Sequence, residues 1–297
     1  RKITVDDLGY LIGPIINAGG RLGYANYGVE LLSSDDTSLV KKRCIQLIDL
    51  NNKRKKIEQN ILNEINFEKI KKDNKNVIIY YKPNINEGVI GIIAARLKDY
   101  FNKPSIVITS SNTTFKGSAR STSNYSIGNL IKLLIDKKII EKGGGHNMAA
   151  GFTIKKDNIS LLDNFIQKDY SRKMLNKQNL NKYDMELSIS AINLKFINEI
   201  NKLGPFGNGN PVPTFLFKNL KVTKVTTIKN KHINVILKPR IGKSIKSICF
   251  NSLNTKIGKY LLSYKENIHV IGQIHENNWN NKKVLQLNIK DLLIEFN

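Results

Sequence analysis

Several residue types are scarce in this chain of 297 residues, and each scarcity excludes a class of protein. Cys44 and Cys249 are the only two cysteines and lie far apart, so they form neither a disulfide framework nor a zinc site. Their scarcity fits a reducing, cytoplasmic setting. No apolar run reaches the length that spans a bilayer, and no signal peptide is visible. We therefore expect no membrane partner.

Acidic residues and arginine are also scarce. The chain has 24 Asp and Glu against 48 Lys and Arg, which gives a formal net charge of +24. Such a charge predicts a polyanionic partner. Only eight of the 48 basic residues are arginine, while Lys, Asn and Ile are overused throughout, as AT-rich codon usage would produce. An arginine beside glycine and serine is therefore more informative than another lysine, and both Arg21 and Arg120 fit that description.

The N-terminal part of the chain predicts helices. The sequence begins at Arg1 in the middle of an apolar pattern, which suggests a segment of a longer protein. From Asp36, a candidate N-cap, to about Asn66, apolar residues recur at helical spacing. A helix of this length spans about 45 Å and would suit a strut between two domains. We expect a long connecting helix within residues 36–72, preceded by a separate segment over residues 1–35.

The remainder of the chain divides into two regions. Residues 73–175 alternate between runs of strand length and helical patterns, which predicts a compact α/β domain. A polar linker follows at 176–182, and residues 183–297 then turn to β, with one helix between late strands. This pattern favours a small Greek-key barrel of the OB type. The strands expected in it are 185–190, 214–227, 232–237, 244–250, 268–275 and 284–294.

Two glycine-containing stretches of the α/β region stand out. Residues 143–151 read Gly-Gly-Gly-His-Asn-Met-Ala-Ala-Gly, and such glycines let consecutive backbone N–H groups converge on an anion beside His146. The alternative is a flexible turn before a strand. Residues 117–121 read Gly-Ser-Ala-Arg-Ser and place Ser118 and Arg120 two apart on an extended segment, so both side chains point to one face. A hydroxyl and a guanidinium on one face suit a phosphate.

Four motifs in a fixed order relate the chain to a known family. They are Gly13-Pro14 with 17–23 (Asn-Ala-Gly-Gly-Arg-Leu-Gly), 88–97 (Gly-Val-Ile-Gly-Ile-Ile-Ala-Ala-Arg-Leu), 117–121 leading to 143–151, and 204–211 (Gly-Pro-Phe-Gly-Asn-Gly-Asn-Pro). With the OB-like region after them, they make the chain similar to the RecJ family of single-strand-specific 5′→3′ exonucleases in the DHH phosphoesterase superfamily. The resemblance covers nearly the whole chain. Each motif alone is weak evidence for this family, since the glycine–histidine motif also occurs in alanyl-tRNA synthetases.

The resemblance implies a division of labour in DNA recombination and repair. Residues 1–35 correspond to the C-terminal end of a DHH domain, whose Asp and His cluster binds divalent Mg or Mn. That cluster is expected upstream, so no catalytic or metal-binding residue is assigned here. Residues 73–175 correspond to the DHH-associated domain, which handles the DNA end, and 183–297 to the domain that holds the single strand. The expected partners are single-stranded DNA and, in the full-length protein, a single-strand-binding protein and a helicase.

The phosphate-binding residues implied by the motifs are Arg21, Ser118, Arg120, Gly144, Gly145 and His146. The alternatives are a structural ion pair for Arg120, a local backbone cap for Arg21 and a structural role for His146. Two positions depart from the family pattern: Ile15 stands where an arginine is usual, and Asn86 where a histidine is frequent.

The remaining expectations concern the aromatic residues and the alternative functions. Trp279 is the candidate for base stacking, because asparagines flank it in an expected loop. Phe215 and Phe217 are expected in the core, and Arg96 is expected to be structural. Two other functions stay open: a binding module without catalysis, and a small-substrate DHH phosphodiesterase acting on nanoRNA or cyclic dinucleotides. The second class has no need of residues 183–297.

Overall fold

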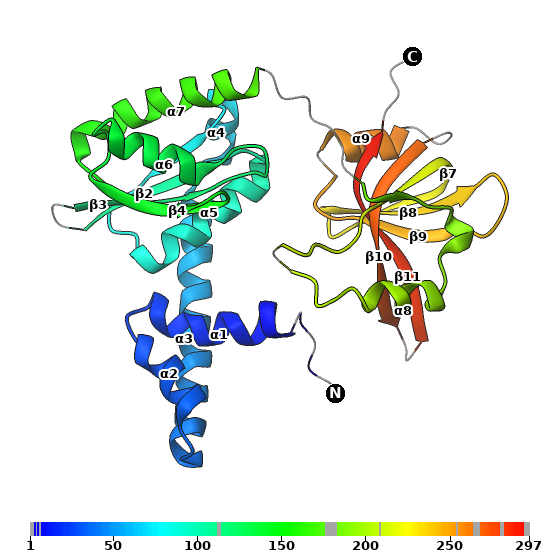
Figure 1. The fold of residues 1–297 in the computed structure, drawn as a ribbon, viewed down its shortest axis with the longest axis horizontal. Coiled ribbons are helices and arrows are strands. Elements are labelled where there is room, and N and C mark those ends of the chain that lie inside the picture. Colours follow the sequence, from blue (N-terminus) through cyan, green and yellow to red (C-terminus); the bar gives the residue numbers. More distant parts are fainter. Residues whose placement is uncertain are drawn as a thin grey trace. The chain divides into compact units, whose positions relative to one another are not determined.

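The computed structural model describes residues 3, 5, 7–111, 114–175, 183–207, 209–253, 255–263, 268–279 and 282–293. For residues 111, 114, 278, 279, 282 and 283 it describes the backbone alone. The chain forms two compact units, Arg1–Lys177 and Gln178–Asn297. Figure 1 shows helices and a sheet in the first unit and a small barrel in the second.

The first unit begins with helices. A π-helical segment, Asp7–Ile12, leads into α1 (Gly13–Arg21), α2 (Ala25–Ser33) and the long α3 (Thr37–Glu64). The predicted N-cap of α3 is confirmed, because the Asp36 carboxylate accepts a hydrogen bond from the backbone N–H of Ser38 at 2.8 Å. With 28 residues, α3 is about 42 Å long. It ends before Ile65, and a separate short helix, α4 (Phe67–Asp73), follows.

Helix α3 joins two apolar clusters and buries polar residues between them. Its first half packs Leu47 and Leu50 against α1 and α2. Its last turns pack Ile61 with the apolar face of α5 (Glu87–Phe101). Between these clusters, the buried side chains of α3 are polar: Asn51, Arg54 and Glu58.

A five-stranded sheet forms the centre of the α/β part. Its strands are β1 (Ile78–Tyr81), β2 (Ser105–Ser111), β3 (Thr114–Arg120), β4 (Lys142–His146) and β5 (Ala149–Ile154). They lie in the order β1-β2-β3-β5-β4, with β1 and β2 parallel and the other pairs antiparallel. Helices α6 (Ile127–Asp136) and α7 (Ile159–Met174) supply apolar side chains to the core on one face. Helix α5 packs on β2 and β3 from the other face.

The glycine-rich stretch forms neither the anion-binding arrangement nor the flexible turn that were considered for it. Residues Lys142–His146 form the edge strand β4, paired with β5 in a tight hairpin. Gly143 and Gly144 have no positive φ, so the expected convergence of consecutive N–H groups on an anion is wrong: successive groups of a strand point in opposite directions. Pairing with β5 is what holds these glycines in an extended conformation. The glycines instead leave a surface without side chains.

The second unit is a closed barrel. Its strands are β7 (Phe215–Ile228), β8 (His232–Pro239), β9 (Ile245–Cys249), β10 (Ile268–Trp279) and β11 (Lys282–Leu293). They lie in the order β7-β8-β9-β11-β10, and β10 pairs back with β7 to close the ring. Helix α9 (Lys256–Ser263) lies between β9 and β10 in the chain, and β9 pairs with β11 in parallel. The predicted OB-type barrel is confirmed.

Two details of the barrel bear on the sequence expectations. Phe215 and Phe217 are 4% and 0% exposed, so both belong to the core, as expected. The strand expected at 185–190 is wrong in most of its length: β6 spans only Met185–Glu186, and a 3₁₀ turn, Ile189–Ala191, and α8 (Leu194–Asn201) follow. Ile189 and Ile197 pack against the barrel core, so burial rather than strand pairing explains the apolar residues here.

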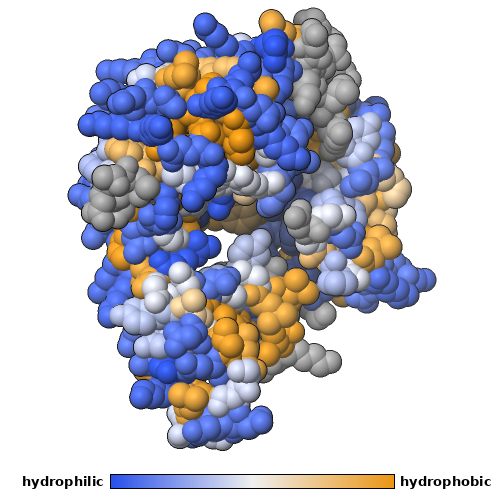
Figure 2. Space-filling view, turned by 60° about the vertical axis from the view of Figure 1, so that its left-hand side comes forward, coloured by the Kyte–Doolittle hydropathy of each residue, from blue (hydrophilic) through white to orange (hydrophobic). Residues whose placement is uncertain are grey.

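The surface of the N-terminal helices is partly apolar. Large side chains exposed on them are Leu8, Tyr10, Leu11, Val29, Leu32 and Ile45. Figure 2 shows orange surface in the lower part of the molecule, where these helices lie. Within the described ranges, no helix combines the length and the apolar composition needed to cross a membrane.

Candidate nucleic-acid interface

Arg21 is the last residue of α1 and lies against the start of α5. Its Nη1 donates a hydrogen bond to the carbonyl of Gly88 at 2.9 Å. A Cβ on Gly88 would lie 2.1 Å from the Arg21 carbonyl oxygen, so only glycine allows α1 to approach α5 this closely. The motifs at 17–23 and 88–97 therefore meet in space, and together they fix the position of the Arg21 side chain.

Arg120 and Ser118 lie on β3 beside the same helix. The Arg120 Nη1 donates to the Ser118 Oγ at 3.2 Å and to the Ala119 carbonyl at 2.8 Å. Both side chains lie over Gly91 of α5, where a Cβ would come within 2.7 Å of Arg120 Nη2 and 3.0 Å of Ser118 Oγ. The prediction that Ser118 and Arg120 share one face is confirmed. Glycine at position 91 makes room for them.

The two guanidinium groups form no direct ion pair within the described ranges, although Glu58 attracts Arg21 at longer range. Neither Arg21 nor Arg120 forms an ion pair with any described carboxylate. Partial burial lowers the pKa of Arg120, and the positive charge of Arg21 lowers it further. Burial likewise lowers the pKa of Arg21, with a second contribution from Arg54. Half-buried cations that repel one another and form no direct ion pair with a described carboxylate make a site that an anion would stabilise.

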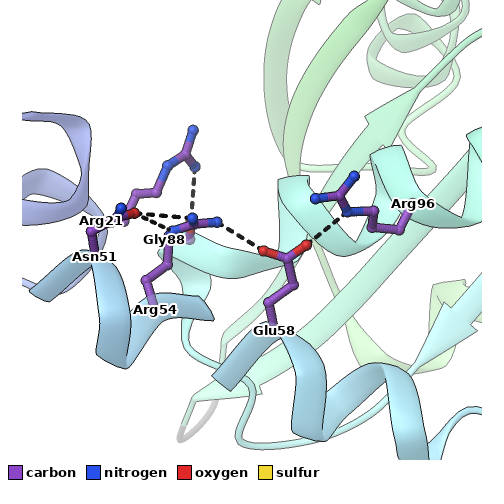
Figure 3. Close-up of polar contacts among 6 residues, drawn as sticks. All are labelled: Arg21, Asn51, Arg54, Glu58, Gly88 and Arg96. Carbon is purple, nitrogen blue, oxygen red and sulfur yellow. Dashed lines mark hydrogen bonds and ion pairs between the residues drawn. The ribbon is translucent and has the colours of Figure 1, made fainter. Parts of the chain in front are cut away.

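A carboxylate within α3 holds two further arginines near this site (Figure 3). The Glu58 Oε2 accepts from Arg54 Nη1 at 2.8 Å, and its Oε1 accepts from Arg96 Nε of α5 at 2.7 Å. Asn51 Oδ1 accepts two more hydrogen bonds from Arg54, from Nη2 at 3.0 Å and from Nε at 3.2 Å. Arg54 and Glu58 are only 8% and 6% exposed. Four of the eight arginines of the chain thus lie at this junction of α1, α3, α5 and β3.

Beside Arg120, the open part of the sheet forms a shallow trough. Three cross-strand rows face the α5 side: Lys116–Thr153–Lys142, Ser118–Gly151–Gly144 and Arg120–Ala149–His146. The middle row is almost bare, since a Cβ on Gly144 would meet nothing within 4 Å. The trough has a volume of about 560 Å³, and its lining includes Ser118, Gly143 and Gly151. It therefore unites the two glycine-containing stretches in one concave surface, with Lys116, Lys142 and Glu87 also in its lining.

The glycine–histidine motif contributes to the trough in three ways. Gly144 lies on the bare row of its floor. Gly145 is required by close packing, because a Cβ there would lie 2.3 Å from the Ala149 carbonyl oxygen. His146 is exposed on the Arg120 row, and its backbone lies against Gly128 of α6. Of the three residues, Gly144 and His146 lie on the same face of the sheet as Ser118 and Arg120, and Gly145 shapes the hairpin.

Sequence reasoning missed several residues of this site. Lys116 and Lys142 flank the trough. The sequence could have revealed them, because residues two apart on a strand point to the same face, and each lysine is two residues from a predicted site residue, Ser118 or Gly144. Lys116 also pairs with Glu87 at 2.5 Å. Arg54 and Glu58 could have been found from their i, i+4 spacing in a chain poor in arginine.

The two departures from the family pattern have structural roles here. Ile15 packs against the apolar cluster formed by α1, α2 and α3. Asn86 is the N-cap of α5, and its side-chain oxygen accepts a hydrogen bond from the Gly88 N–H at 2.9 Å. Asn86 therefore supports the same helix start against which Arg21 lies.

Metal ligands do not gather in the described part of the chain. No three side chains among its His, Cys, Asp and Glu residues lie close enough together to hold an ion.

The barrel presents a second basic surface. On its outer side a row runs across four strands: Lys224 of β7, Ile236 of β8, Lys246 of β9 and Gln286 of β11. All four line a groove of about 240 Å³. In OB folds, the face of the second and third strands binds oligonucleotides, and here these strands are β8 and β9. Trp279 ends β10 with its backbone opposite Lys282, while its side chain lies outside the described residues.

Comparison with known proteins agrees with this architecture. Residues 74–171 match the DHHA1 domain family, and residues 183–291 match the RecJ OB domain family. The single-stranded-DNA-specific exonuclease RecJ of Haemophilus influenzae is 32% identical over 270 residues, covering 86% of this chain and 46% of that protein. The Bacillus subtilis protein of the same name is 29% identical over 298 residues, covering 97% of the chain and 37% of the relative.

A solved structure agrees on the fold. The structure of RecJ from Thermus thermophilus in complex with Mg²⁺ superposes on this chain with a TM-score of 0.74, at 22% sequence identity. The superposition covers 98% of this chain and 44% of the Thermus thermophilus chain. The chain spans less than half the length of each of these relatives. Both domain matches, the relatives and the shared fold point to one conclusion: the chain belongs to the RecJ family, of which it carries the DHHA1 and RecJ OB domains.

Proposed function

We propose that this chain is the DNA-binding portion of a RecJ-like, metal-dependent 5′→3′ exonuclease for single-stranded DNA, acting in recombination and repair. The observation that carries the proposal is the pair Arg21 and Arg120, two partly buried guanidinium groups without a carboxylate partner among the described residues. Relatives named single-stranded-DNA-specific exonucleases support the choice of substrate.

The proposed role of the trough is to bind the 5′-terminal phosphate. A terminal phosphate has more charge than an internal diester and more free oxygens. Arg120 can hold two of them through its planar guanidinium, and the Ser118 hydroxyl can donate to a third. Arg21 then contacts the same or the next phosphate, while Gly144 and Gly151 leave room for the terminal nucleotide. His146 supplies a further donor at the edge of the trough.

The proposed role of the barrel is to hold the single strand. Lys224 and Lys246 neutralise phosphates, while the half-buried Ile236 between them offers an apolar contact to a base. Trp279 remains a predicted stacking residue. This division requires no base-specific contact and suits a protein that follows a strand of any sequence.

We further propose that residues 1–35 are the C-terminal end of a DHH domain. The exposed apolar side chains of the N-terminal helices support this, because they would be covered by such a domain. Catalysis and the divalent Mg or Mn would belong to that domain. A cytoplasmic setting, a single-strand-binding protein and a helicase are the proposed context.

Fluorescence anisotropy with the purified 297-residue chain tests the proposal. We expect single strands to bind more tightly than blunt duplex, and 5′-phosphorylated strands more tightly than 5′-hydroxyl strands. Affinity should fall with salt at a log–log slope of about −0.7 for each neutralised phosphate. Equal affinity for blunt duplex, or an affinity that salt leaves unchanged, would contradict it. Release of nucleotides by the chain with Mg or Mn would contradict the assignment of catalysis to another domain.

A further inference from the structure

The trough extends beyond the proposed position of the terminal phosphate. Its lining includes Ser118 of the middle cross-strand row. The whole of the next row also lines it: Lys116, Thr153 and Lys142. On β3, Arg120 lies two residues after Ser118, and Lys116 lies two residues before it. The cavity of about 560 Å³ therefore runs from Ser118 away from Arg120, and its far end lies outside the contacts assigned to the terminal phosphate.

The centre of this far row is a buried hydroxyl. Thr153 lies on β5 between Lys116 of β3 and Lys142 of β4. It is 8% exposed, and within the described residues its hydroxyl forms no hydrogen bond. Buried polar side chains of native proteins usually have a partner. Because Thr153 is not sealed off but lines the open trough, a ligand in the trough has access to it and can supply that partner.

The lysines on either side of Thr153 supply positive charge to the same place. Lys116 and Lys142 lie on the two strands that flank β5, so their Cα atoms are about 10 Å apart, twice the spacing of neighbouring strands. Side chains of this length can converge on one anion above Thr153. Lys142 forms no ion pair with a described carboxylate.

Lys116 has a competing partner in the same cavity. It forms an ion pair with Glu87 of α5, whose side chain also lines the trough. The side chains of Lys116 and Glu87 are 44% and 39% exposed. An ion pair with this much exposure contributes little, so a phosphate can take the place of the carboxylate.

The spacing of the rows suits one nucleotide. Ser118 and Lys116 are two residues apart on β3, which corresponds to about 6.7 Å along a strand. Neighbouring phosphates of an extended single strand are separated by a similar distance. A strand whose terminal phosphate lies on Arg120 and Ser118 therefore brings its first phosphodiester to the row of the two lysines.

We propose that Lys116, Thr153 and Lys142 form a second phosphate site, which binds the first phosphodiester of a 5′-phosphorylated strand. The inference rests on the proposed role of the trough in binding the terminal phosphate, and it adds the next contact along the strand. The Thr153 hydroxyl donates to a non-bridging oxygen, and the two ammonium groups balance its charge. Arg21 then belongs to the terminal phosphate. A 5′-mononucleotide has a single phosphate, so the two sites together favour a strand over a released nucleotide.

Removing the charge of one phosphodiester at a time tests the second site. A 5′-phosphorylated dT tetranucleotide with a 3′ fluorophore has three phosphodiesters, and a neutral methylphosphonate can replace any one of them. In anisotropy titrations of the full chain, a methylphosphonate at the first position should weaken binding about tenfold, which is in the range for a hydrogen bond to a charged group. The same group at the third position should have a much smaller effect.

Four variants show whether this loss depends on the proposed residues. Thr153→Val removes the hydroxyl at constant charge and should reduce the loss at the first position from about tenfold to about threefold. Lys142→Ala should reduce it similarly. Lys132→Ala removes an exposed lysine of α6, on the other face of the sheet, and should leave the loss unchanged. Glu87→Gln releases Lys116 from its partner and should increase the loss. Thermal melts of the four variants check the fold.

The outcomes separate this inference from the proposed function. Equal losses at the first and third positions in the wild type would overturn the second phosphate site. A first-position loss that both Thr153→Val and Lys142→Ala leave unchanged would overturn it as well. A wild-type chain that binds 5′-phosphorylated and 5′-hydroxyl tetranucleotides equally, or binds neither, would instead overturn the proposed role of the trough, and the second site with it.

Discussion

The two units present positive charge in different ways. In the first unit, four arginines lie at one junction and a buried carboxylate fixes two of them. In the second unit, exposed lysines line the outer groove of the barrel, and Arg240 is the only arginine of residues 178–297. Arginine offers planar, directional donors, whereas lysine is a flexible point charge. The difference suits the proposed roles, in which the first unit recognises one phosphate in a fixed geometry and the second attracts a chain of phosphates.

The same contrast appears in burial. Arg54 and Glu58 are almost fully buried, so their interaction is weakly screened and strongly dependent on geometry. The exposed lysines of the barrel, such as Lys224 and Lys246, act through solvent and are screened by salt. A net charge of +24 therefore says little about recognition until the cations are sorted by exposure and by partner.

The largest expected effect concerns the carboxylate that braces the arginines. Glu58→Ala leaves Arg54 buried without its counter-charge and should lower the free energy of unfolding of the first unit by about 3–5 kcal/mol. Glu199→Ala in the second unit removes an exposed partner of Lys202 and should cost under about 1 kcal/mol. Chemical denaturation of both variants gives the comparison. Similar losses for the two would show that the buried network is not what stabilises the junction.

The second effect tests the geometry of the side-chain donors while the net charge of the chain stays constant. Arg120→Lys should abolish most of the preference for 5′-phosphorylated over 5′-hydroxyl strands, about 1.5–3 kcal/mol or ten- to a hundredfold. Lys224→Arg on the barrel is the matched change in the other direction and should leave that preference intact. Paired titrations measure both, with thermal melts as the folding control. A phosphate preference that survives in Arg120→Lys would assign Arg120 a structural role.

The third effect separates two glycines of the same sheet. Gly144→Val adds a side chain to the open floor of the trough, where a Cβ meets nothing within 4 Å, so the fold should tolerate it. Binding of 5′-phosphorylated strands should weaken about tenfold, or about 1.4 kcal/mol, because the side chain occupies the ligand space. Gly117→Ala is the opposite case, since its Cβ would lie 2.1 Å from Cζ of Phe152 and destabilise the fold. Unchanged affinity in Gly144→Val would move the binding site away from the trough.

The smallest effect is on salt dependence. Lys246→Ala should remove one phosphate contact and reduce the log–log salt slope for single strands by about 0.7, with little change in phosphate-end preference. Lys202→Ala, outside the groove, serves as the control and should leave the slope unchanged. Titrations from low to moderate salt measure the slopes. Equal slopes for the two variants would remove Lys246 from the binding face.

The sequence predicted most elements because they depend on local patterns. Asp36 marked the start of α3, the alternating patterns of residues 73–175 predicted the α/β part, and most of the expected strand ranges of the barrel agree with the structure. The shared face of Ser118 and Arg120 followed from strand parity. These features are fixed within a few residues of chain.

The features that could not be predicted from the sequence depend on contacts between residues far apart in the chain. Three consecutive glycines have no tendency to form a strand, and β4 exists because β5 pairs with it. Glu58 joins α3 to α5 through Arg96, 38 residues away, and no local pattern reports such a contact. Arg96 was expected to be structural, and its ion pair with Glu58 agrees with that, but its part in holding the arginine junction was not foreseen.

The bare floor of the trough has a consequence for selectivity. Gly144 and Gly151 present only backbone atoms to whatever lies on them, and backbone atoms are the same for every neighbouring base. A floor of this kind has no side chain with which to reject one terminal nucleotide in favour of another. If the trough binds the strand end as proposed, these two positions report where the strand ends and not which base ends it. The missing side chains of the two glycines would then be the source of recognition that is independent of sequence.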